Sequence, residues 1–297
     1  MPEISVVIPT YNRLDTLKFV VPALLDQDLP LEQYEIVVGD SNSTDGTREY
    51  LARVAEEFPN VRHVPGAYGG RAAARNAGIR AAQGDVILFN DSDIVPADDL
   101  LYRHLVRHRT RRKIAVVGWE VQVKSYEDYL SKRAHPELRG ALHPSSRKKL
   151  GWLYFLTGNA SVRREDLLRV GCFDESFTGY GHEDLELGFR LQRAGVPIVY
   201  EPRAVNYHWQ HIPWDEQQRK YEQAGRSTVR FYRKHPVWDV KLRLGMTPLS
   251  LGLHGVVERV VPLRAWIENG AAQPGFARTL SYQYHYLTGV KAALRGR

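Results

Sequence analysis

The chain has 297 residues, of which 43% are hydrophobic and 25% are charged, a balance that is typical of a globular protein with a substantial core. Its single cysteine, Cys172, excludes an intrachain disulfide and indicates a reducing compartment. The first residues lack the basic flank and apolar stretch of a signal peptide, and no apolar run approaches the roughly 18 residues that span a bilayer. We therefore expect a cytoplasmic protein.

The formal net charge is +7, and two stretches are rich in basic residues, 103–113 and 133–149. Such runs can attract nucleic acid, an anionic membrane or a phosphorylated substrate, although a solvated helix face is the simpler interpretation. Few aromatic residues interleave with these charges, which argues against a nucleic-acid partner. A peripheral contact with the inner face of the cell membrane stays open.

The first third of the chain alternates between short apolar runs and segments with helical spacing. The predicted strands are 4–8, 35–38, 61–64 and 86–89, and the predicted helices between them are 14–25, 47–58 and 71–82. This alternation of strand and helix favours a parallel sheet that is covered by helices.

The rest of the chain is less regular. Residues 114–123 and 198–201 are predicted strands, 152–162 is apolar and strand-rich, and 164–170 and 183–194 are predicted helices. From about Trp214 onward the pattern is helical. The apolar positions within 249–261 form one helical stripe, which we expect to pack on the main domain rather than on a membrane.

Acidic side chains follow two of the predicted strands. Asp40 comes after the second strand, and Asp91 and Asp93 come directly after the fourth. Ligands of an open α/β sheet bind beyond the carboxyl ends of its strands, so we expect these acids at one edge. Neighbouring carboxylates repel each other and commonly share a cation, and Mg²⁺ or Mn²⁺ with substrate phosphates fits such ligands. His208 could add a nitrogen ligand that favours Mn²⁺, or it is an ordinary hydrogen-bonded histidine.

Glu183 and Asp184 open a predicted helix after a loop that contains Gly179 and Gly181. The positive end of the helix dipole favours carboxylates at this place, so helix capping is one interpretation. The other interpretation is a general base that removes a proton from an acceptor hydroxyl. The glycines would let the loop approach a bound ligand closely, and they would serve an ordinary turn equally well.

Seven motifs follow one another along residues 4–210. They are Ser5-Val-Val-Ile-Pro-Thr-Tyr-Asn-Arg13, Asp40-Ser-Asn-Ser-Thr-Asp-Gly-Thr47, Ala74-Arg-Asn-Ala-Gly78, Phe89-Asn-Asp-Ser-Asp-Ile-Val-Pro96, Gly158-Asn-Ala-Ser-Val-Arg-Arg164, Val170-Gly-Cys-Phe-Asp-Glu175 and Gly181-His-Glu-Asp-Leu-Glu-Leu-Gly188. Together they resemble the family 2 inverting glycosyltransferases of GT-A fold. The resemblance implies an α/β fold with a mixed, mainly parallel, Rossmann-like sheet flanked by helices.

The resemblance also implies a division of the chain. A GT-A domain would cover residues 1–240, with a nucleotide-sugar-binding half over 1–115 and an acceptor-binding half over 116–240. Residues 241–297 match nothing in the family and would form a helical C-terminal extension.

Individual residues receive roles from the same resemblance. Asp184 matches the catalytic base, and Glu183 matches the neighbour that helps hold the acceptor. Asp91 and Asp93 match the metal-binding Asp-x-Asp pair, and His208 looks like the late histidine that several relatives direct at the metal or the diphosphate. The nucleotide-sugar would contact Pro9, Thr10, Tyr11, Arg13, Asp40, Arg71, Arg75, Asp91 and Ser92, with Asp40 at the base, usually uracil.

The implied reaction is the metal-dependent, inverting transfer of a sugar from a nucleoside diphosphate sugar, a UDP-sugar above all, with Mn²⁺ or Mg²⁺. The acceptor would be a hydroxyl of a glycan, glycolipid or polysaccharide precursor, hence a saccharide or lipid-linked partner. Two positions depart from the family pattern: Gly39 stands where an apolar residue or Asp is common, and Asn90 stands where Leu is common. Neither departure removes one of the functional groups that the resemblance implies.

Three other functions were weighed against this one. A sugar nucleotidyltransferase would carry a glycine-rich phosphate loop after the first strand, where this chain has Pro9 to Arg13 without glycine. A haloacid-dehalogenase-type phosphatase carries its Asp-x-Asp on the first strand, not after the fourth. A nucleotide-sugar-binding protein without catalysis would have the same fold, but retention of both the metal pair and Asp184 argues against it.

Overall fold

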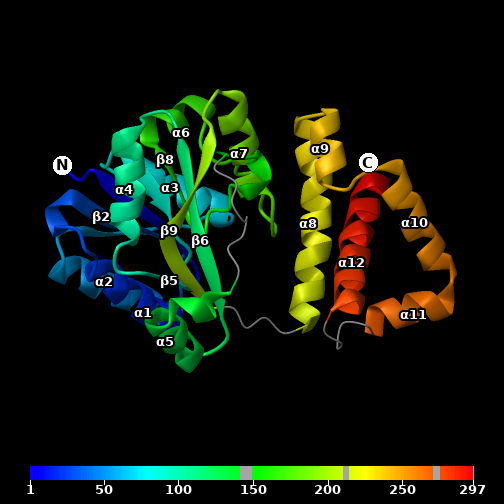
Figure 1. The fold of residues 1–297 in the computed structure, drawn as a ribbon, viewed down its shortest axis with the longest axis horizontal. Helices are drawn as coiled ribbons and strands as arrows, with labels where there is room; N and C mark the ends of the chain where they lie inside the picture. The colour runs from blue at the N-terminus through cyan, green and yellow to red at the C-terminus, as the bar shows by residue number, and fades with distance from the viewer. Residues whose placement is uncertain (141–148, 210–213, 270–274, 297) are drawn as a thin grey trace. The chain divides into compact units, whose positions relative to one another are not determined.

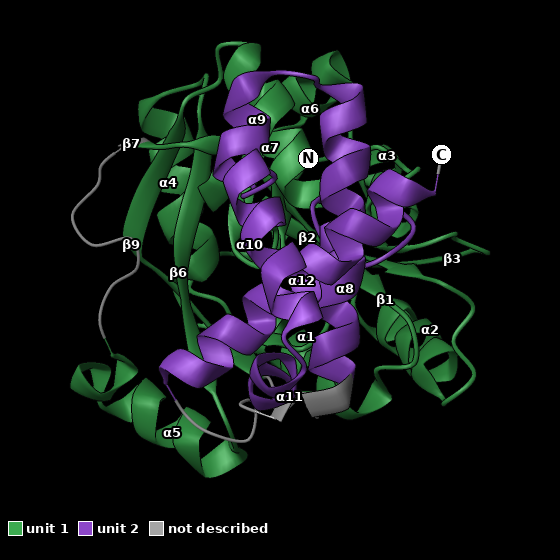
Figure 2. Ribbon diagram, turned by 90° about the vertical axis from the view of Figure 1, so that its right-hand side faces the viewer, with its two compact units in different colours: residues 1–176, 183–211 green, residues 177–182, 212–297 purple. Residues whose placement is uncertain are grey.

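The structure is a computed structural model that describes residues 1–140, 149–209, 214–269 and 275–296. The chain forms two compact units (Figure 2). The sheet unit consists of Met1–Ser176 with Glu183–His211, and the helical unit consists of Phe177–His182 with Ile212–Arg297. Every site residue predicted from the sequence belongs to the sheet unit.

The first half of the sheet unit follows the predicted alternation (Figure 1). Its strands β1 to β4 pair in parallel, with β1 between β2 and β4 and with β3 beside β2. The elements are β1 (Ile4–Thr10), α1 (Leu14–Leu25), η1 (Leu31–Gln33), β2 (Tyr34–Asp40), α2 (Thr47–Glu57), β3 (Val61–Pro65), α3 (Arg71–Ala81) and β4 (Val86–Phe89). The prediction of a parallel sheet with covering helices is confirmed.

The second half of the sheet unit introduces antiparallel pairing. Its elements are β5 (Ile94–Pro96), α4 (Leu100–Thr110), β6 (Ala115–Val123), α5 (Tyr126–Ala134), η2 (Pro136–Arg139), β7 (Lys149–Leu150), η3 (Trp152–Tyr154), β8 (Ala160–Arg163), α6 (Arg164–Val170), α7 (Glu183–Arg193) and β9 (Ile198–Trp209). The strand order is β3-β2-β1-β4-β8-β6-β9-β5, and β7 pairs with β9. β9 is longer than the predicted strand 198–201, because it continues past a register shift beside β6 and then pairs with β5.

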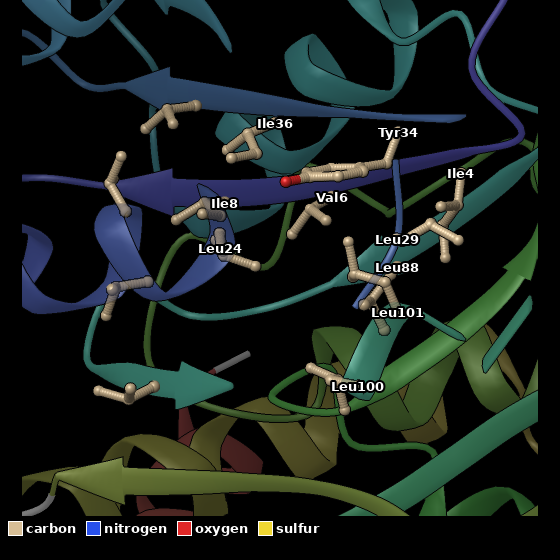
Figure 3. Close-up of a cluster of buried hydrophobic side chains, with 14 of the residues drawn as sticks. Ile4, Val6, Ile8, Leu24, Leu29, Tyr34, Ile36, Leu88, Leu100 and Leu101 are labelled. Carbon is tan, nitrogen blue, oxygen red and sulfur yellow. The ribbon is translucent and has the colours of Figure 1, made fainter. Parts of the chain in front are cut away.

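Strand β1 is buried along its whole length and separates two layers of side chains. On one face a hydrophobic cluster joins it to β2, α1 and α4 (Figure 3), and it includes Ile4, Val6, Ile8, Leu24, Tyr34, Ile36, Leu100 and Leu101. On the other face α3 comes so close that a Cβ on Gly78 would lie 2.6 Å from Cγ1 of Val7. This tight packing fixes α3, with Arg71 and Arg75, against the sheet.

The helical unit consists, over its described residues, of five helices: α8 (Trp214–Lys234), α9 (Trp238–Arg243), α10 (Pro248–Arg259), α11 (Val261–Asn269) and α12 (Phe276–Arg295). α8 and α12 approach each other so closely that Gly225 and Gly289 have no room for a side chain against the facing backbone. Val229, Met246 and Val290 form a small buried cluster beside this crossing. α8 lies within the GT-A domain expected over residues 1–240 and groups by its contacts with the later helices, and the expected boundary at residue 240 stays a prediction.

The short segment Phe177–His182 also belongs to the helical unit, although it lies just before α7 in the chain. The backbone N–H of Tyr180 donates to Gln223 Oε1 at 3.1 Å, and Ser227 Oγ donates to the Tyr180 carbonyl at 3.1 Å. His182 Nε2 lies 2.7 Å from Thr228 Oγ1. The segment is therefore held along α8.

No helix in the part of the chain that the structure describes is long and apolar enough to cross a bilayer.

Candidate active site

The turn after β4 carries Asp91, Ser92 and Asp93, and Asn90 shapes it. The fully buried Asn90 donates from Nδ2 to the carbonyl oxygens of Asp91 at 2.9 Å and of Ile94 at 2.8 Å. A leucine at this position would have no donor for either carbonyl. The departure from the family pattern at Asn90 therefore supplies two hydrogen bonds to the turn that presents both carboxylates.

Arg75 joins this turn to the start of α7. Its side chain is 1% exposed, and it donates from Nη2 to Asp91 Oδ1 at 2.7 Å and from Nη1 to Glu183 Oε1 at 3.1 Å. Arg71, one turn earlier on α3, lies 3.5 Å from the same Glu183 oxygen. Residues four apart share one face of a helix, so both guanidinium groups reach the same edge of the sheet. The structure thus brings together Arg71, Arg75, Asp91 and Glu183.

The two carboxyls of the turn are in different electrostatic states. Burial alone would raise the pKa of Asp91, but the positive charges of Arg75 and Arg71 outweigh it and hold this pKa below its usual value. Burial and the negative charge of Asp91 raise the pKa of Asp93. Arg75 and Arg71 balance the negative charge of Asp91. A bound cation would in the same way stabilise the charged form of Asp93.

His208 faces Asp93 from strand β9, where the β5 pairing sets it opposite Ile94. Its Nε2 lies 3.8 Å from Asp93 Oδ1, and its Nδ1 lies 2.8 Å from Glu120 Oε1 on β6. Burial would lower the pKa of His208, but the hydrogen bond and charge of Glu120 and the charge of Asp93 raise it. Because the Nδ1–H group of His208 donates to the carboxylate of Glu120, the ring presents Nε2 toward Asp93.

Glu120 was not among the predicted site residues, and the register of β6 and β9 places it beside His208. The available signal was a carboxylate inside an otherwise apolar strand. Gln122 Nε2 also donates to Glu120 Oε1, at 2.7 Å, and helps to hold it.

The chemistry of this donor set fits a divalent cation. Asp91, Asp93 and His208 supply the carboxylate oxygens and imidazole nitrogen that Mn²⁺ accepts. No compact cluster of three or more His, Cys, Asp or Glu side chains surrounds one point within the described ranges, so an ion here would need further ligands, such as phosphate oxygens and water. Thr10 Oγ1 and Glu183 Oε2 are buried and have no hydrogen-bond partner among the described residues, so both oxygens are available to a bound ligand.

The predicted nucleotide end forms a second group at the ends of β1 and β2. Their parallel register sets Thr10 opposite Asp40, and Pro9 precedes Thr10 in the same buried strand. Asp40 is fully buried, and its Oδ1 accepts from the backbone N–H of Ser43 at 3.1 Å and from Ser43 Oγ at 2.6 Å. His63 Nε2 lies 3.4 Å from the other oxygen, Oδ2. Neither Ser43 nor His63 was predicted: Ser43 bonds to Asp40 from three residues along the chain, whereas only the pairing of β2 with β3 brings His63 to it.

The remaining predicted nucleotide contacts lie around this edge. Tyr11 follows β1 and is exposed, Arg13 precedes α1, and Ser92 is buried in the turn after β4. Gly39, the other departure from the family pattern, has a structural cause: a Cβ there would lie 2.6 Å from the Ala74 carbonyl oxygen of α3. The substitution allows a close approach between α3 and β2 and leaves the Asp40 side chain in place.

Asp184, beside Glu183 in the first turn of α7, has the properties of a base that works near neutral pH. Burial and the negative charge of Glu183 raise the pKa of Asp184 to about 7, against the opposing effect of Arg75. Its Oδ1 accepts from the backbone N–H of Leu185 at 2.8 Å. A general base is most effective when its pKa lies near the working pH. The arrangement can therefore take a proton from a nearby hydroxyl.

Comparison with known families supports the resemblance seen in the motifs. Residues 5–171 match the model of the family described as glycosyl transferase family 2. The chain belongs to glycosyl transferase family 2. Residues 141–211 also match a model described as the N-terminal domain of galactosyltransferase. Validoxylamine A glucosyltransferase from Streptomyces hygroscopicus subsp. jinggangensis is 31% identical over 87% of this chain, which spans 66% of that relative, just under two thirds of its length.

Solved structures confirm the GT-A fold of this family 2 chain. A mannosyltransferase from Pyrobaculum calidifontis in complex with GDP-Man and Mn²⁺ superimposes with a TM-score of 0.66 at 23% identity, over 100% of this chain and 88% of that one. S. aureus TarS 1–349 in complex with UDP gives a TM-score of 0.58 at 18% identity, over 100% and 92% of the two chains. At such identities the likeness establishes the fold alone.

Proposed function

We propose that this protein is a metal-dependent, inverting glycosyltransferase that moves a sugar from a UDP-sugar to an acceptor hydroxyl. The observation that carries the proposal is the double ion pair of Arg75, which holds Asp91 of the metal turn and Glu183 of the base segment on one guanidinium group. Donor activation and acceptor activation then take place side by side. This arrangement in a family 2 chain supports the proposed transfer.

The donor would lie along the edge formed by the ends of β1, β2 and β4. Asp40, fixed by Ser43 and close to His63, would contact the nucleotide base, with Pro9, Thr10, Tyr11 and Arg13 along the nucleoside. Thr10 Oγ1 is a buried hydroxyl that such a ligand can satisfy. Ser92, Arg71 and Arg75 would face the diphosphate and sugar.

Asp93, His208 and Asp91 would hold the cation, and the nitrogen of His208 favours Mn²⁺ over Mg²⁺. When bound, the cation would stabilise the negative charge that develops on the departing diphosphate. Glu120 positions His208, because its carboxylate takes the Nδ1 side of the ring and leaves Nε2 toward Asp93.

Asp184 is proposed as the base. Its carboxylate takes the proton from the acceptor hydroxyl while the acceptor oxygen bonds to the anomeric carbon, and the bond from that carbon to the diphosphate oxygen breaks with its electron pair on the leaving group. This single displacement from the opposite face inverts the anomeric configuration. Glu183 keeps Oε2 free of protein partners in the described chain, so it can accept a hydrogen bond from the acceptor.

The acceptor is proposed to be a hydroxyl of a glycan, glycolipid or polysaccharide precursor, and the protein is proposed to work in the cytoplasm without a nucleic-acid partner. A non-catalytic nucleotide-sugar-binding protein remains the competing hypothesis. Against it stands Asp184, whose pKa, raised to about 7 by burial and by Glu183, suits proton transfer.

The test measures release of nucleoside diphosphate from a panel of UDP- and GDP-sugars with Mn²⁺, with and without saccharide acceptors. Asp184→Asn should lower turnover by about 10³-fold, within the range for a lost general base, while Mn²⁺-dependent donor binding stays within about threefold. Asp85→Asn is the matched control, because its side chain is 83% exposed and should leave turnover unchanged.

Two results would contradict the proposal. Full turnover in Asp184→Asn would remove the base assignment, and tight donor binding without turnover of any donor in the wild type would favour the binding protein. Retention of the anomeric configuration in the product, seen by NMR, would remove the inverting mechanism.

A further inference from the structure

The two units of the chain differ sharply in charge. The sheet unit has 27 Lys and Arg against 28 Asp and Glu, a net charge of −1, and the helical unit has 14 against 6, a net charge of +8. The whole positive charge of the protein therefore belongs to the helical unit. A strong positive field over one part of a protein favours association with an anionic surface.

The basic stretches predicted to attract such a surface are largely paired within the sheet unit. Arg103 lies 2.7 Å from Asp99, Arg109 lies 2.5 Å from Glu3, and Arg133 lies 2.7 Å from Asp98. Residues 141–148 of the stretch 133–149 lie outside the described residues. The described part of 103–113 and 133–149 thus offers less unpaired charge than the sequence suggests.

The helical unit exposes large apolar side chains on α10 and α11. Leu249, Leu253 and Val256 on α10 are 74%, 60% and 56% exposed, and Trp266 on α11 is 51% exposed. Spacings of four and three residues put the α10 side chains on one face. Within the described residues of the helical unit itself, no other helix covers these side chains.

The opposite face of α10 is fixed by α12, so the apolar face cannot turn inward. His254 is buried, stacks on Tyr284 with ring centroids 4.8 Å apart, and lies 3.0 Å from Thr288 Oγ1. Lys291 Nζ of α12 donates to Glu258 Oε2 at 2.6 Å. A capping box of Thr247 and Ser250 starts the helix, which further sets its orientation.

We propose that α10 and α11 form a docking surface for an anionic lipid bilayer. Leu249, Leu253, Val256 and Trp266 would enter the boundary between headgroups and acyl chains, while Arg259 in the last turn of α10 would meet anionic headgroups. A helix pair with an exposed Leu, Val and Trp face and a basic background is the pattern of interfacial binding. Tryptophan is favoured at this depth because its ring is amphipathic.

Charge decides between a bilayer and a second copy of the chain. Two helical units that associate through this face would bring together two bodies of net charge +8. An anionic bilayer relieves that charge, and each Lys or Arg near its surface adds to the attraction. The surface is therefore assigned to lipid, and self-association and an acidic protein become alternative outcomes of the test.

The test is co-sedimentation of the full chain with vesicles of phosphatidylcholine alone and with vesicles that also contain about 30 mol% phosphatidylglycerol. Wild type should bind the anionic vesicles at least about tenfold more strongly, and about 0.5 M NaCl should weaken this binding. Leu253→Asn combined with Val256→Asn should lower the partition coefficient by about tenfold or more. The matched control, Leu130→Asn combined with Leu168→Asn, changes two leucines of the sheet unit that are 44% and 46% exposed and should bind as wild type does.

Tryptophan fluorescence gives a second, local readout. Brominated phosphatidylcholine mixed into the anionic vesicles should quench the emission, and Trp266→Phe should remove most of that quenching. Asp184→Asn should bind vesicles like wild type, because docking is independent of the transfer reaction.

The proposal is overturned if wild type ignores anionic vesicles, or if the α10 double variant binds them as well as wild type. It is also overturned if light scattering shows a dimer that the α10 double variant dissociates. Circular dichroism and thermal melting confirm that each variant is folded before its binding is compared.

Discussion

The sheet unit and the helical unit use charged residues in opposite ways. In the sheet unit, buried acids and arginines compensate each other locally, as Arg75 does with Asp91 and Glu183, and the net charge is −1. In the helical unit, basic residues outnumber acids, the net charge is +8, and apolar side chains lie exposed among them. Charge is therefore balanced inside the candidate site of the sheet unit, whereas the excess positive charge of the chain belongs to the helical unit.

The largest expected effect concerns the buried ion pairs of the sheet unit. Arg75→Met should lower the free energy of unfolding by about 3–5 kcal/mol, because it leaves the carboxylates of Asp91 and Glu183 without their partner. Urea denaturation measures this change. Arg264→Met is the matched control in the helical unit, where the pair with Glu268 at 3.0 Å is exposed and its loss should cost less than about 1 kcal/mol. Equal losses of unfolding free energy in the two variants would contradict the proposed difference between buried and exposed ion pairs.

A smaller effect is expected for the carboxylate behind His208. Glu120→Gln should weaken Mn²⁺ affinity by about tenfold, because an amide orients the imidazole less strongly than a carboxylate. Isothermal titration of Mn²⁺ into the protein with UDP measures it. Glu222→Gln, which changes a similar carboxylate–histidine pair with His285 at 3.2 Å in the helical unit, should leave Mn²⁺ affinity unchanged. An unaltered affinity in Glu120→Gln would remove its role as a positioning residue.

An effect of similar size is a dependence of kcat/KM on pH that separates the two units. Because the pKa of Asp184 is raised to about 7, kcat/KM should fall by about tenfold per pH unit below that value as the base becomes protonated. The same raised pKa contributes stability at low pH that is lost as the pH rises through about 7. Vesicle binding should stay constant between about pH 6 and 8, since Lys and Arg keep their charge there. A flat kcat/KM profile over this range would count against Asp184 as the base.

Much of the sheet unit was predictable because its signals are local. The strands 4–8, 35–38 and 86–89 are apolar runs that end at polar turns, and parallel strands bring their carboxyl ends to one edge. Asp40, Asp91 and Asp93 could therefore be expected at that edge from the sequence alone. The GT-A fold and the membership in family 2 followed from the order of the motifs.

What could not be predicted depends on pairing between distant segments. Glu120 reaches His208 only through the register of β6 and β9, and His63 reaches Asp40 only through the parallel pairing of β2 and β3. The local pattern of hydrophobic residues does not predict either strand register. What covers the apolar face with Leu253 and Val256 could not be predicted for a related reason, because periodicity identifies an apolar face and does not say what packs on it.

The segment Phe177–His182 connects the helical unit to the start of α7 through the chain itself. It is hydrogen-bonded along α8 through Tyr180 and His182, and Asp184 stands only two residues beyond His182. A displacement of α8 thus has a covalent path to the proposed base that is shorter than one turn of a helix.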